Sequence, residues 1–354
     1  MFPNIFPPFQ PKGGALNKLY GGIDLHANNS VVVVLDEADQ VQYRKRLPNE
    51  LEQILQPLAP FRAHLEGLVV ESTYNWYWLV DGLQSEGYCV HLANPAAMQQ
   101  YAGLKYTNDD MDARWLAHLL RLGLLPTGYI YPKEERAIRD LLRKRSQLVR
   151  QKTANLLSIQ NLLTRNTGQA LNGTQIKQLT PSTVRALVDL PEHALALEVT
   201  VAVMQHLAEQ ITQVERAVHA RVKLRPTFQS LLTVPGIGQT LALTIMLETG
   251  EIDRFPTVGQ FASYCRCVGS TKLSNGKCKG QGNPKNGNKY LAWAFVEAAH
   301  VAIRYEPQIA QFYQRKRAKT KVMVALKAVA HKLARACYYL MRDTVPFDVT
   351  RAFA

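Results

Sequence analysis

The sequence predicts a mixed α/β domain followed by mostly α-helical regions, and three observations support this prediction. Short β-rich runs are concentrated in the first hundred or so residues, with turn-like or helical segments between them. Apolar residues recur with a period near 3.6 over 133–165 and 191–222, as expected of long amphipathic helices. Two further helical patterns, 290–304 and 319–341, close the chain. At about 100–200 residues per domain, its 354 residues suggest two or three domains.

Five β-rich runs make up the predicted sheet. They are residues 19–24, 30–36, 41–47, 67–72 and 88–92. The first three follow one another across turn-like segments, which predicts an antiparallel meander. Helical patterns at 49–58 and 75–84 separate the last two from the meander and from each other. A meander followed by helix-separated strands predicts a mixed sheet flanked by helices.

The two long helical patterns predict an antiparallel coiled coil or helical arm, because a polar connector around residues 166–175 separates them. An ordinary helical domain is the alternative. The first 18 residues hold several prolines and a Gly-Gly pair, which interrupt any periodic pattern. The expected division is a leader over 1–18, the α/β domain over 19–132, the arm over 133–227 and a C-terminal domain over 228–354.

The composition points to a folded protein with a polyanionic partner. Lys and Arg number 42 and Asp and Glu 28, which gives a net charge of +14, and 47% of the residues are hydrophobic. Such a surplus attracts nucleic acid, and the apolar content excludes a wholly disordered chain. No run of 18 apolar residues and no signal-peptide pattern is present, so a soluble, intracellular protein with no membrane partner is expected.

Four acids form the first candidate site. Asp24 and Glu71 each lie at the end of a predicted strand, where side chains from distant sequence positions converge on one sheet edge. Asp109 and Asp112 are spaced i, i+3 at the start of a predicted helix and therefore face the same way. Asp110 is the alternative to Asp109, although on a helix it points away from Asp112.

Four carboxylates brought together repel one another unless divalent cations lie between them. We therefore expect Mg²⁺, with two ions in the site and Mn²⁺ as a substitute, to serve phosphodiester cleavage. Taken alone, each acid has the alternative of a helix cap or a solvated surface group. Their order along the chain, however, reproduces that of an RNase H-like nuclease site, the fold class that also includes RuvC-like domains.

Three further features suggest contacts with nucleic acid. Residues 235–238, PGIG, lie between apolar helical runs, and Gly236 and Gly238 permit a tight turn near a helix N-terminus, as in a helix-hairpin-helix element; a simple helical turn is the alternative. A Gly/Asn-rich basic loop and a basic C-terminal stretch contain no acid. The candidate phosphate-binding side chains there are Arg266, Lys272, Lys277, Lys279, Lys285, Lys289, Arg315, Arg317 and Lys321. The alternatives are a flexible basic loop and a solvated helix face.

The ordered series of these motifs resembles a known family. The acids lie in GIDLHANN, VVEST and NDDMDARWLAHLLRLGLLP, followed by LLTVPGIGQTLALTI, FPTVGQFASYCRCVG, SNGK, NPKNGNKYL and KVMVALKAVAHKLARACYYL. This series is similar to the DEDD transposases of the insertion-sequence "one-ten" family, relatives of the Piv-type DNA invertases. The resemblance covers most of residues 19–342.

The resemblance implies a catalytic serine, which falls on Ser274 of SNGK. Asn275 stands beside it where the family often has glycine, and Ser270 is the alternative hydroxyl. A serine needs help from a base, a metal or a cation to act as a nucleophile. The resemblance also implies donor and target DNA, a non-coding guide (bridge) RNA and a homo-oligomer, a dimer or tetramer, in which carboxylates and serine form a composite site.

The sequence thus predicts a DNA transposase or site-specific recombinase of an insertion sequence. An RNase H-like nuclease specific for Holliday junctions, using carboxylates and water alone, is the nearest alternative. A non-enzymatic nucleic-acid-binding protein is the other. Free DNA ends would favour the nuclease, and indifference to removal of Mg²⁺ would favour the binding protein.

Overall fold

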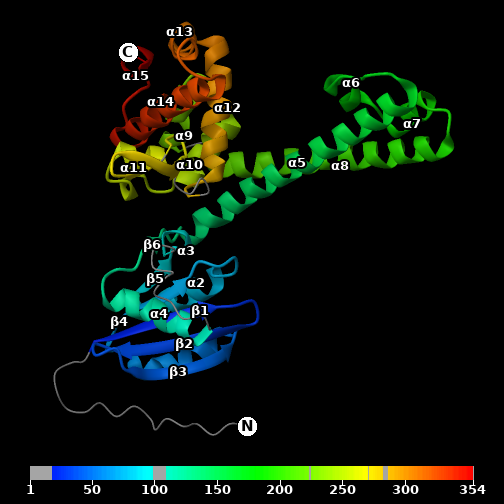
Figure 1. Cartoon of the computed structure of the whole chain (residues 1–354). Coiled ribbons are helices and arrows are strands. Elements are labelled where there is room, and N and C mark those ends of the chain that lie inside the picture. The colour runs from blue at the N-terminus through cyan, green and yellow to red at the C-terminus, as the bar shows by residue number, and fades with distance from the viewer. Residues whose placement is uncertain (1–17, 99–108, 223–224, 270, 282–285, 354) are drawn as a thin grey trace. The chain divides into compact units, whose positions relative to one another are not determined.

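The structure is a computed structural model that describes residues 18–98, 109–222, 225–269, 271–281 and 286–353 (Figure 1). The predicted leader up to residue 17 lies outside this description. The chain divides into two compact units, Met1–Lys133 and Glu134–Ala354, which we call unit 1 and unit 2. No helix of the described residues is long and apolar enough to cross a membrane.

Unit 1 contains a six-stranded mixed sheet in the order β3-β2-β1-β4-β5-β6. The strands are β1 (Leu19–Leu25), β2 (Asn29–Asp36), β3 (Val41–Pro48), β4 (Leu65–Glu71), β5 (Val90–Ala93) and β6 (Thr127–Gly128). The first three form an antiparallel meander, and β4 and β5 run parallel to β1. The predicted mixed sheet and its five strands are confirmed. The two-residue strand β6, which pairs antiparallel with β5, was not predicted.

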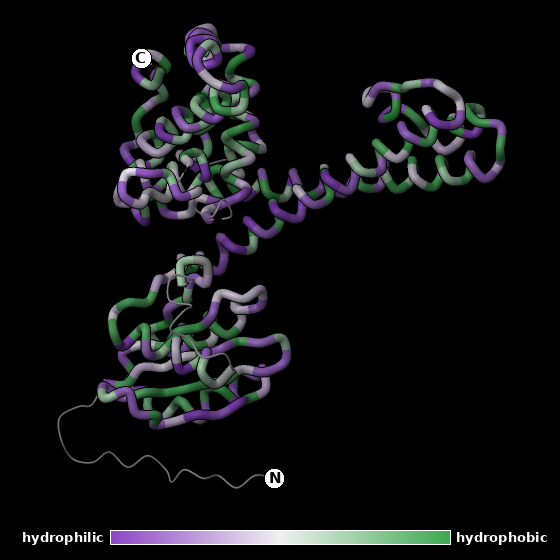
Figure 2. Tube along the Cα trace, viewed as in Figure 1, coloured by the Kyte–Doolittle hydropathy of each residue, from purple (hydrophilic) through white to green (hydrophobic). Residues whose placement is uncertain are grey.

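Helices cover both faces of this sheet. They are α1 (Leu51–Leu58), α2 (Tyr77–Ser85), α3 (Pro95–Met98) and α4 (Asp109–Arg121). Along β2 the side chains alternate: Val31 and Val33 pack with Ala113 and Ala117 of α4, whereas Val32 joins the cluster that contains α1 and α2. A strand buried on both faces reads as a continuous apolar run, which explains the sequence VVVVL. Figure 2 shows the hydrophobic stretches along these strands.

The first two helices begin two residues later than predicted because Asn49 and Asn75 have other partners. The Nδ2 groups of both side chains donate to the carbonyl oxygen of His26, at 2.9 and 3.0 Å. An asparagine whose side chain bonds to a neighbouring loop in this way does not join the helix, which therefore begins after it. These two bonds also hold the turn that follows β1.

Unit 2 is almost entirely helical. Its helices are α5 (Lys133–Thr167), α6 (Gly173–Gln178), α7 (Pro181–Val184), α8 (Pro191–Val222), α9 (Pro226–Leu231), α10 (Gln239–Thr249), α11 (Val258–Tyr264), α12 (Lys289–Tyr305), α13 (Pro307–Arg317), α14 (Val322–Asp343) and α15 (Val349–Phe353). Both predicted long helices are confirmed as α5 and α8, which run side by side in Figure 1. Near their joined ends, α6 and α7 share a small apolar core with them.

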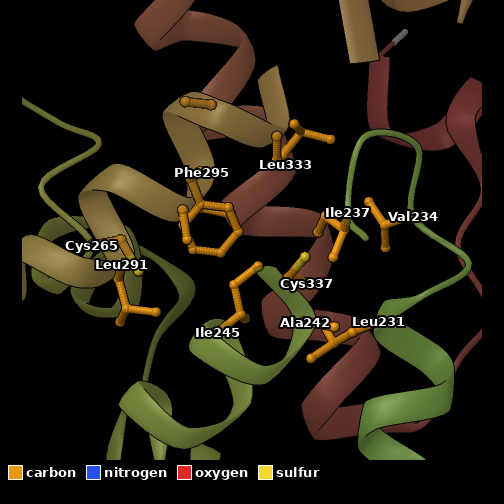
Figure 3. Close-up of a cluster of buried hydrophobic side chains, with 14 of the residues drawn as sticks. Leu231, Val234, Ile237, Ala242, Ile245, Cys265, Leu291, Phe295, Leu333 and Cys337 are labelled. Atoms are coloured by element: carbon orange, nitrogen blue, oxygen red, sulfur yellow. The ribbon is translucent and has the colours of Figure 1, made fainter. Parts of the chain in front are cut away.

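The larger core of unit 2 is built mainly by α10, α12 and α14. Figure 3 shows Ile245, Phe295 and Leu333 from these three helices meeting around Cys337. The thiol of Cys337 is fully buried, and this burial raises its pKa well above the ordinary value. The cysteine therefore serves as a small apolar side chain here.

A two-stranded hairpin replaces the flexible basic loop that was one interpretation of this region. Strands β7 (Thr271–Ser274) and β8 (Lys277–Gln281) pair antiparallel across Asn275-Gly276. Both turn residues have positive φ, 50° for Asn275 and 70° for Gly276, as a type I′ turn requires. Asn-Gly is the strongest short hairpin signal, and the Gly/Asn-rich composition concealed it.

Candidate carboxylate site and serine-bearing hairpin

Asp24 is the most buried of the predicted site acids that the structure describes. It lies one residue before the end of β1, and the residue is only 3% exposed. Its Oδ2 atom lies 3.3 Å from Nε2 of His26, which begins the turn held by the two asparagines. Sequence reasoning passed over His26, although its place two residues after a strand-end acid was a usable signal.

Strand pairing brings Glu71 to the same edge of the sheet. Because β4 runs parallel to β1 with Ile23 opposite Val70, Asp24 and Glu71 occupy the next positions on neighbouring strands. Their carboxyl groups share a hydrogen bond, which contributes to the raised pKa of Asp24. The expectation that the two strand-end acids converge is thereby met for this pair.

Helix α4 brings Asp112 to this edge because its backbone lies directly on β1. The contact occurs at Gly22, where a Cβ atom would collide with the carbonyl oxygen of Ala113 and lie 2.8 Å from the backbone nitrogen of Ala117. Only glycine opposite two alanines permits such an approach. Gly22 and Asp24 lie on the same face of β1 because side chains alternate, so α4 covers the side of the sheet on which Asp24 lies.

The electrostatics of Asp24 show that the acids act on one another. The pKa of Asp24 is raised from 3.8 to about 7, mainly by burial and in part by the hydrogen bond and charge of Glu71 and the charge of Asp112, although the charge of His26 lowers it. The shift therefore reflects first the burial of this carboxyl group and then the two acids beside it. Perturbation of this kind is typical of functional sites, although structural clusters also produce it.

The three described acids suit a hard divalent cation by their chemistry. Carboxylate oxygens are the ligands that Mg²⁺ prefers, and a cation would offset both the burial of the Asp24 charge and its repulsion by Glu71 and Asp112. Within the described residues, no group of three or more His, Cys, Asp or Glu side chains is already arranged to hold a metal ion. Asp109 and Asp110 begin α4, and their side chains lie outside the description.

A second set of contacts secures α4 to the meander. Asp39, in the turn between β2 and β3, accepts hydrogen bonds from Arg114 at 3.0 Å and Arg121 at 3.2 Å, and its Oδ1 lies 2.7 Å from Nδ1 of His118. Partial burial acts to raise the pKa of Asp39, but His118 and the two arginines outweigh it and lower the pKa. The helix that carries Asp112 is thus attached to the sheet at two points, Gly22 and Asp39.

Ser274 lies beside the turn of the hairpin in unit 2. It pairs with Lys277 across the Asn-Gly turn and is exposed, so its hydroxyl group is accessible to a bound nucleic acid. Ser270, the alternative nucleophile, lies outside the described residues, as do Lys285 and the side chain of Lys272.

The other predicted basic contacts fall into two groups. Exposed side chains are Lys277, Lys279, Lys289, Arg315, Arg317 and Lys321, as phosphate contact requires. Arg266 is half-buried, has a left-handed φ of 55° and donates from Nη2 to the carbonyl oxygen of Gly287 at 2.8 Å. Its guanidinium group therefore has a structural partner inside the protein.

The PGIG turn joins α9 to α10, and its two glycines differ. Gly236 has φ of 84°, and a Cβ atom there would collide with the carbonyl oxygen of Ala298 and lie 2.8 Å from the nitrogen of Ala302, both in α12. Close packing against α12 therefore explains why residue 236 is a glycine, and no ligand is needed for that explanation. Gly238 caps α10 and is exposed, with open space where a Cβ would stand, so an approach by phosphate is sterically possible there.

Comparison with known proteins agrees with this distribution of groups. A family model described as a DEDD transposase of IS110 type matches residues 21–166, which include the carboxylate site. A second, described as "Transposase IS116/IS110/IS902 family", matches residues 229–314, which include the hairpin with Ser274. The chain belongs to the IS110 family of transposases. It is accordingly a DNA transposase or recombinase, an enzyme whose substrates are DNA.

Individual relatives agree with the family models. The transposase for insertion sequence element IS1328 of Yersinia enterocolitica is 24% identical over 342 residues, 92% of this chain and 98% of the relative. The pilin gene-inverting protein of Moraxella bovis is 25% identical over 297 residues, 79% of this chain and 81% of the relative. A 43.6 kDa protein of insertion element IS110 from Streptomyces coelicolor is 28% identical over 136 residues, which span 38% of this chain and only 34% of that protein.

Proposed function

We propose that this transposase cuts and rejoins DNA strands with a metal-bound carboxylate site in an RNase H-like domain and a serine nucleophile in its C-terminal domain. Asp24, Glu71, Asp109 and Asp112 would hold the metal, and Ser274 would attack the phosphodiester. The proposed functional domains are 19–132, 133–227 for the helical arm and 228–354. The proposed place of action is the prokaryotic cytoplasm.

The gathering of Asp24, Glu71 and Asp112 at one edge of the sheet is the observation that carries the proposal. Asp24 is buried, is hydrogen-bonded to Glu71 and lies near the charge of Asp112. Its ionised form lowers the stability of the fold, because desolvation and repulsion both oppose ionisation. Such a cluster is expected where function requires it. Bound Mg²⁺ would supply Lewis-acid stabilisation of developing negative charge on the reacting oxygens.

The chain's own groups have definite tasks in this scheme. The carboxylates would orient the metal, and His26 beside Asp24 would favour the ionised form of that carboxyl group. The Oγ atom of Ser274 forms a bond to phosphorus while the bond between phosphorus and the 3′ oxygen of DNA breaks. The serine proton passes to a base, and the departing 3′ oxygen takes up a proton. The reverse attack by a 3′ hydroxyl of another strand reforms the phosphodiester and frees the serine, so no ATP is consumed.

The nucleic-acid partners proposed are donor DNA, target DNA and a non-coding guide RNA, with the protein acting as a homo-oligomer. The exposed lysines beside Ser274 and the exposed basic residues at the end of α13 offer phosphate contacts. Structured RNA is recognised largely through its shape and backbone, and a basic surface of this kind serves both RNA and DNA. The guide RNA itself is proposed from the family resemblance.

Trapping of a covalent protein–DNA intermediate tests the proposal. DNA labelled at one end is incubated with Mg²⁺ and denatured, and the attachment site is mapped by mass spectrometry. The wild-type protein should give an adduct at Ser274, and Ser274→Ala should give none while DNA binding changes by less than a factor of two. Thr271→Ala removes another exposed hydroxyl from the same hairpin and is the matched control.

Three outcomes would contradict parts of the scheme. An adduct that maps to Ser270 would move the nucleophile and leave the covalent mechanism intact. Free DNA ends without any adduct, at equal rates in wild type and Ser274→Ala, would replace it with the carboxylate nuclease. Strand exchange that continues at the wild-type rate in EDTA would exclude the metal.

A further inference from the structure

Glu248 is a buried carboxylate in unit 2 for which the proposed chemistry gives no role. It lies near the end of α10 and is 1% exposed. Arg143 of α5 grips it with two hydrogen bonds, from Nε to Oε1 at 2.6 Å and from Nη2 to Oε2 at 2.7 Å. The residue is too deeply buried to contact nucleic acid. Its effect must therefore pass through the residues it binds.

The second partner of Glu248 is Asn288, at the end of the segment that carries the hairpin. The Asn288 Nδ2 group donates to Oε2 of Glu248 at 2.7 Å. Its Oδ1 atom accepts from the backbone nitrogens of Tyr290 and Leu291 and so caps α12. One side chain thus joins the start of α12 to the buried carboxylate.

The residues that precede the hairpin are hydrogen-bonded to the residues that follow it. The backbone nitrogen of Asn288 donates to the carbonyl oxygen of Tyr264 at 2.6 Å, and Arg266 donates to that of Gly287 at 2.8 Å. Gly287 has φ of 86°, and a Cβ atom there would lie 2.5 Å from the Tyr264 oxygen, so glycine is required. We call these four residues, Tyr264, Arg266, Gly287 and Asn288, the neck of the hairpin.

Among the described residues, little else orients the hairpin. Each of its side chains from Ser274 to Gly280 is exposed. Between the described elements, neither β7 nor β8 makes a broad contact with any element except its partner strand. An exposed two-stranded hairpin is marginally stable alone, so the direction in which it projects depends on how its two ends are held.

A buried ion pair is well suited to holding the neck in one arrangement. Such pairs contribute little net stability compared with apolar packing, but separation of the partners leaves an uncompensated charge inside the protein. The planar fork of Arg143 restricts the carboxylate of Glu248 to one orientation, in which Oε2 faces Asn288. The Cζ atom of Arg143 lies 4.8 Å from the centre of the Tyr290 ring, so this ring also packs against the guanidinium group.

We propose that Glu248 is a positioning residue, which through Asn288 and the neck orients the hairpin so that Ser274 can attack the phosphodiester. This role rests on the proposed function of Ser274. Arg143 holds the carboxylate of Glu248 in place. Because Arg143 belongs to α5, this helix also contributes to the orientation of the hairpin. Strand cleavage therefore depends on a contact that touches neither DNA nor metal.

The test compares variants that loosen the neck with a matched change elsewhere. Asn288→Ser keeps a capping hydroxyl for α12 but loses the amide that donates to Glu248. Glu248→Gln removes the charge from the pair. Glu135→Gln is the control, because Glu135 forms a similar two-bond pair with Arg225, at 2.7 and 2.8 Å, without contact with the neck.

Three quantities are measured on the full-length protein: the rate of covalent adduct formation at saturating DNA, the Kd for the same DNA, and hydrogen–deuterium exchange of the hairpin peptide. Asn288→Ser and Glu248→Gln should slow adduct formation at least tenfold, change Kd less than twofold and speed exchange in the hairpin. Glu135→Gln should leave all three near wild type. If Glu248→Gln does not fold, Arg143→Lys keeps the charge, loses the fork and should give the same pattern more weakly.

Unchanged exchange and an unchanged adduct rate in Asn288→Ser would overturn the positioning role. Parallel losses of rate, binding and melting temperature would also overturn it, because they indicate general damage to the fold. A failure of the proposed function is distinguishable from either: Ser274→Ala would then still form the adduct, whereas hairpin exchange would continue to report whether the neck is loosened.

Discussion

Replacement of Asp24 by asparagine should stabilise unit 1 near neutral pH while it abolishes strand cleavage. The carboxyl group is buried beside Glu71, and its pKa is about 7 in the folded protein against 3.8 when unperturbed. Ionisation at pH 8 is therefore more costly in the folded than in the unfolded chain. Asparagine is nearly the same size and carries no charge, so the variant avoids this cost.

The magnitude and its pH dependence follow from the two pKa values. Their difference corresponds to about 4 kcal/mol, because one pKa unit is about 1.4 kcal/mol. Below about pH 4 the group is protonated in both states, and the variant should gain nothing. Between pH 4 and 7 only the folded state holds the proton, so wild-type stability falls as pH rises and the advantage of Asp24→Asn grows. Above pH 7 the advantage is complete.

Urea unfolding followed by tryptophan fluorescence provides the measurement. Three of the four tryptophans, Trp76, Trp78 and Trp115, lie in unit 1, and a Trp293→Phe background removes the signal from unit 2. Mg²⁺ should stabilise the wild type by RT ln(1 + [Mg²⁺]/Kd), about 3 kcal/mol at 100 times Kd, and should have a much smaller effect on Asp24→Asn.

Glu66→Gln is the control for this series, because Glu66 lies on β4 of the same sheet but is exposed. Its stability should follow that of the wild type across the pH range. The reasoning is refuted if Asp24→Asn is destabilised at pH 8, or if its difference from the wild type is the same at pH 4.5 and pH 8. Equal stabilisation of the variant and the wild type by Mg²⁺ would refute the role of Asp24 in metal binding.

Three other changes test the contacts that position the two sites. Gly22→Val should push α4 away from β1, lower the urea-unfolding stability of unit 1 by about 1–3 kcal/mol or more and abolish cleavage. Asp39→Asn should destabilise unit 1 by about 1–2 kcal/mol at pH 7, and this difference should vanish in acid, because the lowered pKa of Asp39 contributes stability that is lost as pH falls through it. Gly236→Ala should lower the melting temperature of unit 2 by several degrees, whereas Gly123→Ala, with φ of 67° but open space around it, should cost only the backbone strain.

Patterns of short range are what made the fold predictable. The run of valines in β2 and the 3.6-residue period of α5 and α8 each concern a single element and its burial, so they are visible in a few neighbouring residues. Even there, Asn49 and Asn75 shifted two helix starts, because their amides bond to the His26 carbonyl across the fold.

The hairpin of unit 2 was hard to predict from the sequence for a different reason. Asn275-Gly276 is a local signal for a tight turn, and it was available in the sequence. It was overlooked because the surrounding glycines, asparagines and lysines are typical of a loop, and because the hairpin buries too little to show an alternating apolar pattern.

The sequence by itself determined the two long helices, five strands of the sheet and the order in which the acids occur, since secondary structure follows local periodicity and the family resemblance depends on ordered motifs. Only the tertiary structure decided which charges act on one another. The pKa of Asp24 depends on a parallel strand pair and on the helix that Gly22 admits, and the role of Glu248 depends on Arg143, 105 residues away. Electrostatic and hydrogen-bond energies depend on distance in space, and the separation of residues along the chain does not determine that distance.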